Sequence, residues 1–84
     1  MTGEPARLTL LVRAYCHLCD EMREALAPLA FAAGCNVEEI DVDTRPALEA
    51  RWGELVPVLL AGEQEICHYR IDRAAVAAYF ASSA

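Results

Sequence analysis

An apolar run, a cysteine pair and an amphipathic helical pattern follow one another near the start of the chain, and this order most limits the fold. Leu8–Val12 (LTLLV) has the composition of a strand that is covered on both faces of a sheet. Cys16 and Cys19 come next, and apolar residues then recur at helical spacing as far as Gly34, a typical helix stop. Pro28 falls inside this helix and is expected to kink it or to end its first segment. The pattern predicts a cysteine pair where a buried strand turns into a helix.

The rest of the chain predicts three more strands and two more helices. In chain order they are a strand over Val37–Val42, a short helix with Pro46 in its first turn that ends at Gly53, strands over Val58–Ala61 and Glu65–Tyr69, and a helix that Asp72 caps. Asp43 or Thr44 is expected to cap the short helix. A helical crossover makes the first two strands parallel, and a short turn makes the last two an antiparallel hairpin. The order β-α-β-α-β-β-α over residues 1–84 predicts one α/β domain, a four-stranded mixed sheet with helices on both faces.

Composition limits the partners and the compartment. Thirteen acidic residues against seven basic ones give a net charge of −6, so no nucleic-acid partner is expected, because phosphate binding needs a positive surface. No apolar run approaches membrane-spanning length and the first residues lack a secretory pattern. We therefore expect a cytoplasmic monomer with no membrane association. In a reducing compartment, structural disulfides among Cys16, Cys19, Cys35 and Cys67 are not expected.

The predicted place of Cys16 at a helix start suggests thiol chemistry. Free backbone N–H groups and the helix dipole favour an anion there, so we expect the pKa of the Cys16 thiol to be lowered. Cys19 lies close enough to close a disulfide with it, the division of labour that thiol–disulfide exchange needs. His17 either donates to the Cys16 thiolate or is a solvated turn residue. Asp20 and Glu21 suit a helix start, yet their charge opposes a thiolate.

Metal binding is the competing use of the cysteine pair. A structural zinc site needs a second pair of ligands at a set distance. Cys35 stands alone, and Cys67 and His68 are neighbours on a predicted strand, where alternation points them to opposite faces. We favour a redox couple and predict no metal site, with metal binding through Cys-x-x-Cys as the minor alternative.

Over nearly its whole length the chain resembles the thioredoxin-fold superfamily, and within it the glutaredoxins. The segment from Arg13 to Cys19 (RAYCHLC) is similar to their basic residue, two further residues and then Cys-Pro-Tyr-Cys. Leu55-Val56-Pro57 is similar to their Thr-Val-Pro, whose proline is cis and lies against the active-site cysteines. The resemblance implies a thiol–disulfide oxidoreductase in which Cys16 attacks, Cys19 resolves the mixed disulfide, and His17 and Arg13 tune the thiolate.

The resemblance also implies a substrate site. Its residues would be Tyr15, Val56, Pro57, Cys67, His68 and Asp72. The backbone of Val56 would pair with an extended substrate beside the cis-proline. The family's Gly-Gly corresponds to Cys67-His68, whose side chains would obstruct the close approach of glutathione. Asp72 would meet the glutathione amine and Arg51 a carboxylate, so glutathione is a candidate co-substrate.

The sequence leaves two alternative functions, which belong to different classes of protein. The first is an oxidoreductase that acts on a disulfide-containing protein or on glutathione, with no cofactor permanently bound. The second is a thioredoxin-fold module that docks onto a partner protein without catalysis. Of the other residues, Cys35 is expected to be structural or merely exposed, and Trp52 is expected to lie in the core.

Overall fold

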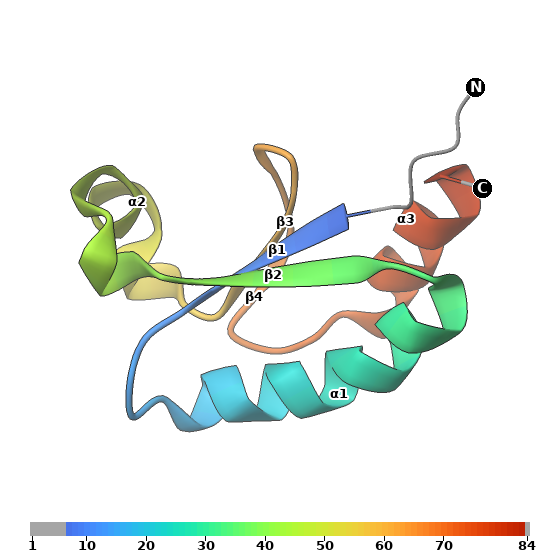
Figure 1. Ribbon diagram of the computed structural model, residues 1–84, viewed down its shortest axis with the longest axis horizontal. Helices are drawn as coiled ribbons and strands as arrows, with labels where there is room; N and C mark the ends of the chain where they lie inside the picture. Colours follow the sequence, from blue (N-terminus) through green and yellow to red (C-terminus); the bar gives the residue numbers. More distant parts are fainter. Residues whose placement is uncertain (1–6, 84) are drawn as a thin grey trace.

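A computed structural model describes residues 7–83 and shows a four-stranded sheet flanked by helices (Figure 1). The strands are β1 (Arg7–Val12), β2 (Asn36–Asp41), β3 (Val58–Ala61) and β4 (Gln64–His68). The helices are α1 (His17–Ala33), α2 (Pro46–Trp52) and α3 (Arg73–Ser83), with 3-10 turns at Val42–Thr44 and Gly53–Leu55. None of the helices in this described range has the length and apolar character that a bilayer crossing requires. The predicted element order is confirmed.

The sheet has the strand order β2-β1-β3-β4. β1 and β2 are parallel, because α1 carries the chain from the end of one to the start of the other. β3 runs antiparallel to β1 and pairs with β4 in a hairpin. The sheet is therefore mixed, as predicted.

Each face of the sheet carries its own core, because side chains alternate along a strand. Leu10 and Leu11 of β1 have no exposed surface, which confirms that this strand is covered on both faces. One core contains Leu10 with residues of α1 and α3, and the other contains Leu11 with Trp52 of α2. In Figure 1, α1 and α2 accordingly lie on opposite sides of the sheet. The sheet is therefore covered by helices on both faces.

Helix α1 is one continuous element. It ends at Gly34, whose φ of 65° is the left-handed conformation expected of a glycine stop. Pro28 lies inside the helix, which runs on to Ala33, so the end expected there does not occur. Met22, Leu26 and Ala30 are buried on one stripe across this position, and their packing against the sheet holds the helix together.

Two strands begin one residue earlier than predicted. β2 covers residues 36–41 and β4 covers residues 64–68. Val42 leaves the strand because it begins a 3-10 turn in which its side chain is fully buried. Tyr69 leaves because its φ is 64°, outside the range of a strand.

The predicted caps of α2 are wrong. The N-cap residue is Arg45, whose side chain makes no capping hydrogen bond. Asp43 and Thr44 belong to the preceding 3-10 turn, where the Asp41 carboxylate accepts from the Asp43 N–H at 2.9 Å. Pro46 at the start of α2 has no N–H, so the helix has fewer donors that need a cap.

Candidate functional site

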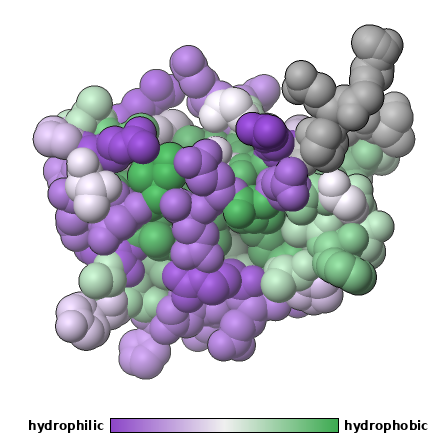
Figure 2. Space-filling view, in the orientation of Figure 1, coloured by the Kyte–Doolittle hydropathy of each residue, from purple (hydrophilic) through white to green (hydrophobic). Residues whose placement is uncertain are grey.

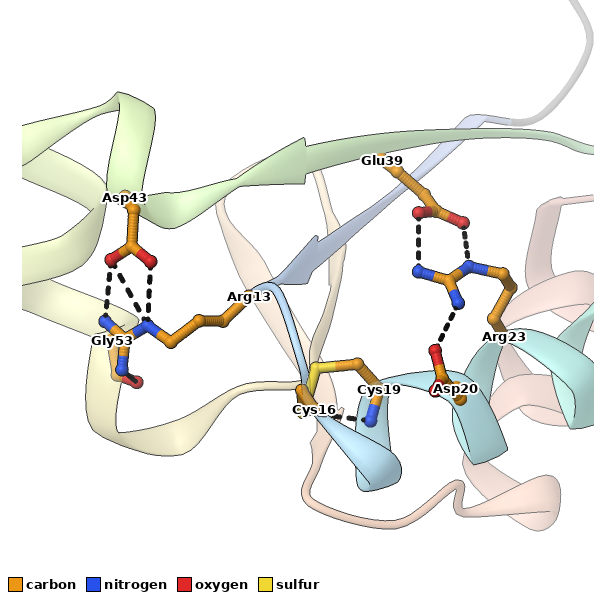
Figure 3. The surroundings of a disulfide bond; sticks show 8 residues. All are labelled: Arg13, Cys16, Cys19, Asp20, Arg23, Glu39, Asp43 and Gly53. Atoms are coloured by element: carbon orange, nitrogen blue, oxygen red, sulfur yellow. Dashed lines mark hydrogen bonds and ion pairs between the residues drawn. A yellow bond between two sulfur atoms is a disulfide. The ribbon is translucent and has the colours of Figure 1, made fainter.

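Cys16 and Cys19 form a disulfide where α1 begins (Figure 3). Cys16 is the N-cap residue with an extended backbone, and the two Cα atoms are 5.2 Å apart. The Cys19 backbone N–H donates to the Cys16 Sγ at 3.1 Å, so a sulfur occupies the position that a capping oxygen commonly fills. In the reduced protein the same N–H favours a thiolate at Cys16.

The two sulfurs differ in exposure. Cys19 is only 1% exposed and belongs to the core between α1 and the sheet. Cys16 is half-buried and packs on the edge of that core. Thiol–disulfide exchange needs access to the attacked or attacking sulfur, so Cys16 is the one that an incoming group reaches.

Pro57 lies at the same end of the sheet as the disulfide. Leu11 of β1 pairs with Val58 of β3, which places Pro57 beside the point where β1 leads to Cys16. The Val56–Pro57 peptide bond is cis, as predicted. Val56 has an extended backbone and lies between the 3-10 turn and β3, outside the strand pairs of the described sheet. An extended backbone at the edge of this site can pair with an extended segment from another molecule.

Two tyrosines with unusual backbone conformations flank this region. Among the described residues other than glycine, Tyr15 (φ 57°) and Tyr69 (φ 64°) are the ones with positive φ. The Tyr15 side chain is fully exposed, and that of Tyr69 is 44% exposed. The Tyr69 hydroxyl donates to the Glu54 carbonyl at 3.1 Å. The glycine-like backbone thus lies one residue beyond the Cys67-His68 pair that was matched to Gly-Gly.

Tyr69 is the residue of this region that sequence reasoning missed. It was placed inside a strand because it continues the alternation of β4. Tyr69 leaves the strand because its φ is positive. Tyrosine rarely adopts a positive φ, so the sequence carries no signal for this turn.

Arg13 points away from the disulfide in Figure 3, contrary to the predicted tuning contact. Its guanidinium donates to Asp43 at 3.2 Å, to Glu49 at 3.0 Å and to the Gly53 carbonyl at 3.3 Å. These three acceptors anchor the segment after β1 to the region of α2. His17 is exposed, and nothing within residues 7–83 binds its ring, which matches the solvated alternative.

The acidic residues beside the disulfide are paired with arginines. Arg23 donates to Asp20 at 2.7 Å and to Glu39 of β2 at 2.6 Å, and Glu39 and then Asp20 raise the pKa of this guanidinium above its usual value (Figure 3). Arg70 lies 3.5 Å from Glu21. The carboxylates that would oppose a Cys16 thiolate are partly neutralised.

Cys67 and His68 point to opposite faces of the sheet, as alternation predicts. Cys67 is buried in the α1 core, and this burial raises the pKa of its thiol while the backbone N–H of Asp72 opposes the rise. His68 Nδ1 lies 2.5 Å from Glu65 Oε2. The bulge at Ile66 brings these two side chains to one face. Neither residue is a freely exposed thiol or base in the conformation described.

Asp72 and Arg51 lie in different places. Asp72 Oδ1 accepts from the Ala75 N–H at 3.0 Å, so the predicted cap of α3 is confirmed. Arg51 lies on α2 with its Cζ 4.8 Å from the Trp52 ring centroid. It lines a cavity with Gly62, at the end of β3 that is remote from Pro57. Arg51 is therefore not placed to bind a carboxylate at the disulfide.

Cys35 lies at the other end of α1 from the disulfide. Its thiol donates to the Asn36 carbonyl at 3.4 Å, and burial raises its pKa. Cys35 thus has a structural place, as expected.

Among residues 7–83, no three His, Cys, Asp or Glu side chains gather in a way that could hold a metal ion.

A disulfide at the junction of β1 and α1, with a cis-proline leading into the neighbouring strand, defines a glutaredoxin-like protein of the thioredoxin fold. Residues 7–81 match the family model described as Glutaredoxin-like domain (DUF836). The chain belongs to this family.

Relatives and solved structures agree with this assignment. Protein Mb0520 of Mycobacterium bovis and protein Rv0508 of Mycobacterium tuberculosis are each 34% identical over 71 residues, which cover 79% of this chain and 73% of the relative. The solution NMR structure of protein Ne2328 from Nitrosomonas europaea has a TM-score of 0.82 at 34% identity and covers 94% of this chain and 95% of its own. The X-ray structure of protein XcR50 from X. campestris has a TM-score of 0.68 at 36% identity and covers 89% and 96%.

Proposed function

We propose that the chain is a thiol–disulfide oxidoreductase with Cys16 and Cys19 as its redox couple. The observation that carries this proposal is the pairing of a half-buried sulfur at a helix start with a buried sulfur behind it. The Cys19 N–H that donates to Cys16 Sγ supports a thiolate in the reduced form. Asp20 and Glu21, whose charge would oppose this thiolate, are paired with Arg23 and Arg70.

The sequence of reaction steps follows from the exposure of Cys16 and the burial of Cys19. The Cys16 thiolate attacks one sulfur of the substrate disulfide, a Cys16–substrate disulfide forms, and the other substrate sulfur leaves as a thiolate. Cys19, deprotonated to solvent, then attacks Cys16 Sγ, which closes the Cys16–Cys19 bond and releases the second substrate thiolate. Two electrons and two protons pass from the dithiol to the substrate. An external thiol returns the protein to its dithiol form by the reverse steps.

The extended backbone of Val56 beside the cis-proline supports an extended polypeptide as the substrate. Glutathione is the candidate small co-substrate, and Asp72 offers it the carboxylate oxygen that α3 does not use. The cycle needs no permanently bound cofactor. A monomer in the cytoplasm, where thiol reductants are abundant, fits this cycle.

The test is a disulfide-reduction assay with a peptide disulfide as substrate and glutathione as reductant. We expect wild-type protein to turn over, Cys16→Ser to fall to background, and Cys35→Ser to keep its rate within about twofold. Cys35→Ser is the matched control because it removes a thiol remote from the disulfide. Equal background rates for wild type and Cys16→Ser would instead favour the non-catalytic docking module, for which the fully exposed Tyr15 is the supporting observation.

A further inference from the structure

We propose that a cavity between α2 and the sheet, separate from the disulfide, binds a small organic anion with an apolar body. The cavity has a volume of about 420 Å³, within the range of small-molecule sites in proteins. It opens beside Gly62 in the turn between β3 and β4, the end of β3 opposite to Pro57. The proposal does not depend on the redox function.

The floor of the cavity is apolar. Ile40 of β2 and Leu60 of β3 line it, together with Leu48 and Trp52 of α2. In Figure 2, apolar surface is recessed among hydrophilic side chains on the side where α2 lies. Such a floor suits an alkyl or aryl group and does not suit the polar peptide body of glutathione.

The rim carries positive charge without an internal partner. Arg45 and Arg51 line the cavity, and within residues 7–83 neither forms an ion pair. This is notable in a chain with thirteen acidic and seven basic residues, where Arg13 and Arg23 each contact two carboxylates. Glu63 is the one acidic residue of the lining, so the rim keeps a net positive charge.

Arg51 is held in a position that suits an anion. Its Cζ lies 4.8 Å from the centroid of the Trp52 ring, a cation–π contact, and within residues 7–83 its N–H groups make no hydrogen bond. A guanidinium with free N–H groups can donate two parallel hydrogen bonds to a carboxylate or a phosphate. Thr9 adds a hydroxyl to the lining. An anionic head at the arginines and an apolar tail on the floor would satisfy both parts of the cavity.

Trp52 reports directly on this cavity, because it is the only tryptophan of the chain. We would titrate the protein with hexanoate, hexyl phosphate and hexan-1-ol, none of which absorbs where tryptophan is excited, and follow Trp52 fluorescence and the backbone amide signals of Thr9 and Gly62 by NMR. Hexanoate and hexyl phosphate separate the two anionic heads, and hexan-1-ol has the same tail without charge. We expect saturable binding of at least one anion, with hexan-1-ol about tenfold weaker, the factor expected for a charged hydrogen bond.

Variants separate the cavity from general attraction to an arginine. Arg45→Gln and Arg51→Gln should each weaken binding about tenfold, and Ala47→Phe, which narrows the cavity, should weaken it without removing charge. Arg73→Gln, on α3 and outside the cavity, should change affinity by less than about twofold. Cys16→Ser should bind as wild type does, so that failure of the redox proposal leaves this result intact.

Results of three kinds, on anion binding, on specificity and on self-association, would overturn the proposal. One is the absence of saturable binding by both anions. Another is equal affinity for hexan-1-ol and the anions, or equal losses in Arg73→Gln and Arg45→Gln. The third is a fluorescence change that follows protein concentration rather than ligand concentration, which would show that a second copy of the chain covers this face.

Discussion

The backbone N–H of Tyr69 donates a hydrogen bond to the carbonyl oxygen of Pro57 at 2.9 Å. This bond extends the pairing of β3 and β4 by one step, beyond the Val58–His68 pair, into the segment that precedes β3. It holds the exposed Tyr69 side chain beside the cis-proline, and the Tyr69 hydroxyl fastens to the Glu54 carbonyl on the same segment. The end of β4 and the approach to β3 therefore form one wall of the candidate site.

The strained backbone of Tyr69 predicts that a glycine variant at this position is more stable than an alanine variant. With φ at 64°, a residue with a Cβ is disfavoured there and glycine is not. Tyr69→Gly should therefore be more stable than Tyr69→Ala by about 1 kcal/mol in urea unfolding. Ala77→Gly, within α3, is the control and should be destabilised by about 1 kcal/mol. If Tyr69→Ala were the more stable variant at position 69, the left-handed backbone assigned to it would be wrong.

Arg23 should affect the reactivity of Cys16 although it does not touch the sulfur. Its removal would leave the Asp20 carboxylate, in the first turn of α1, without the neighbouring positive charge that offsets its repulsion of a thiolate. We expect Arg23→Gln to raise the pKa of the reduced Cys16 thiol by a few tenths of a pH unit, since exposed ion pairs have small energies. The measurement is the pH dependence of Cys16 alkylation by iodoacetamide, with Arg73→Gln as control. An unchanged profile would show that Asp20 does not act on the thiolate.

The buried thiols predict a pH dependence of stability. Burial raises the pKa of Cys35 and Cys67 above the usual value of 9.0, so the folded protein holds these protons more tightly than the unfolded chain. Their contribution to the free energy of unfolding is complete below about pH 9 and is lost as the pH rises through the folded-state pKa values. Urea unfolding at about pH 7 and about pH 10 should show this decline, and a variant with alanine at both positions should decline less. The same decline in both proteins would contradict the assignment.

Asp72 can be tested for its two proposed roles separately. Asp72→Ala removes the cap of α3 and should cost about 1 kcal/mol, whereas Asp72→Asn keeps a capping oxygen and should cost less. If the carboxylate also meets the glutathione amine, Asp72→Asn should reduce the rate with glutathione disulfide but leave the rate with a peptide disulfide unchanged. Equal rates of wild type and Asp72→Asn on both substrates would remove Asp72 from the substrate site.

The fold could be predicted from the sequence because each element has a local signal. The apolar run of β1 and the glycine after α1 are such signals, and β3 has the bounds that were predicted. The helix end predicted at Pro28 was wrong because the packing of α1 on the sheet outweighs the low helix propensity of proline. The predicted caps of α2 were wrong because both candidate side chains have other partners: the Asp43 carboxylate accepts from Arg13, and the Thr44 hydroxyl donates to the Asp41 carbonyl.

The candidate site was less predictable, because it depends on contacts between distant residues. The cysteine pair and the cis-proline follow from motifs. The orientation of Arg13 does not, because it is decided by Asp43, Glu49 and the Gly53 carbonyl, which lie 30 to 40 residues away. The wall formed by Tyr69 depends on a backbone angle that tyrosine does not favour.

The most direct test of the redox proposal is to trap the first step of the reaction. Reduced Cys19→Ser protein, which lacks the resolving sulfur, is mixed with a peptide disulfide, and the product is mapped by mass spectrometry under non-reducing conditions. We predict a stable disulfide between the peptide and Cys16, and none with Cys35 or Cys67 in the folded protein. Failure to trap the peptide at Cys16, or trapping at a buried thiol instead, would contradict the assignment of Cys16 as the attacking group.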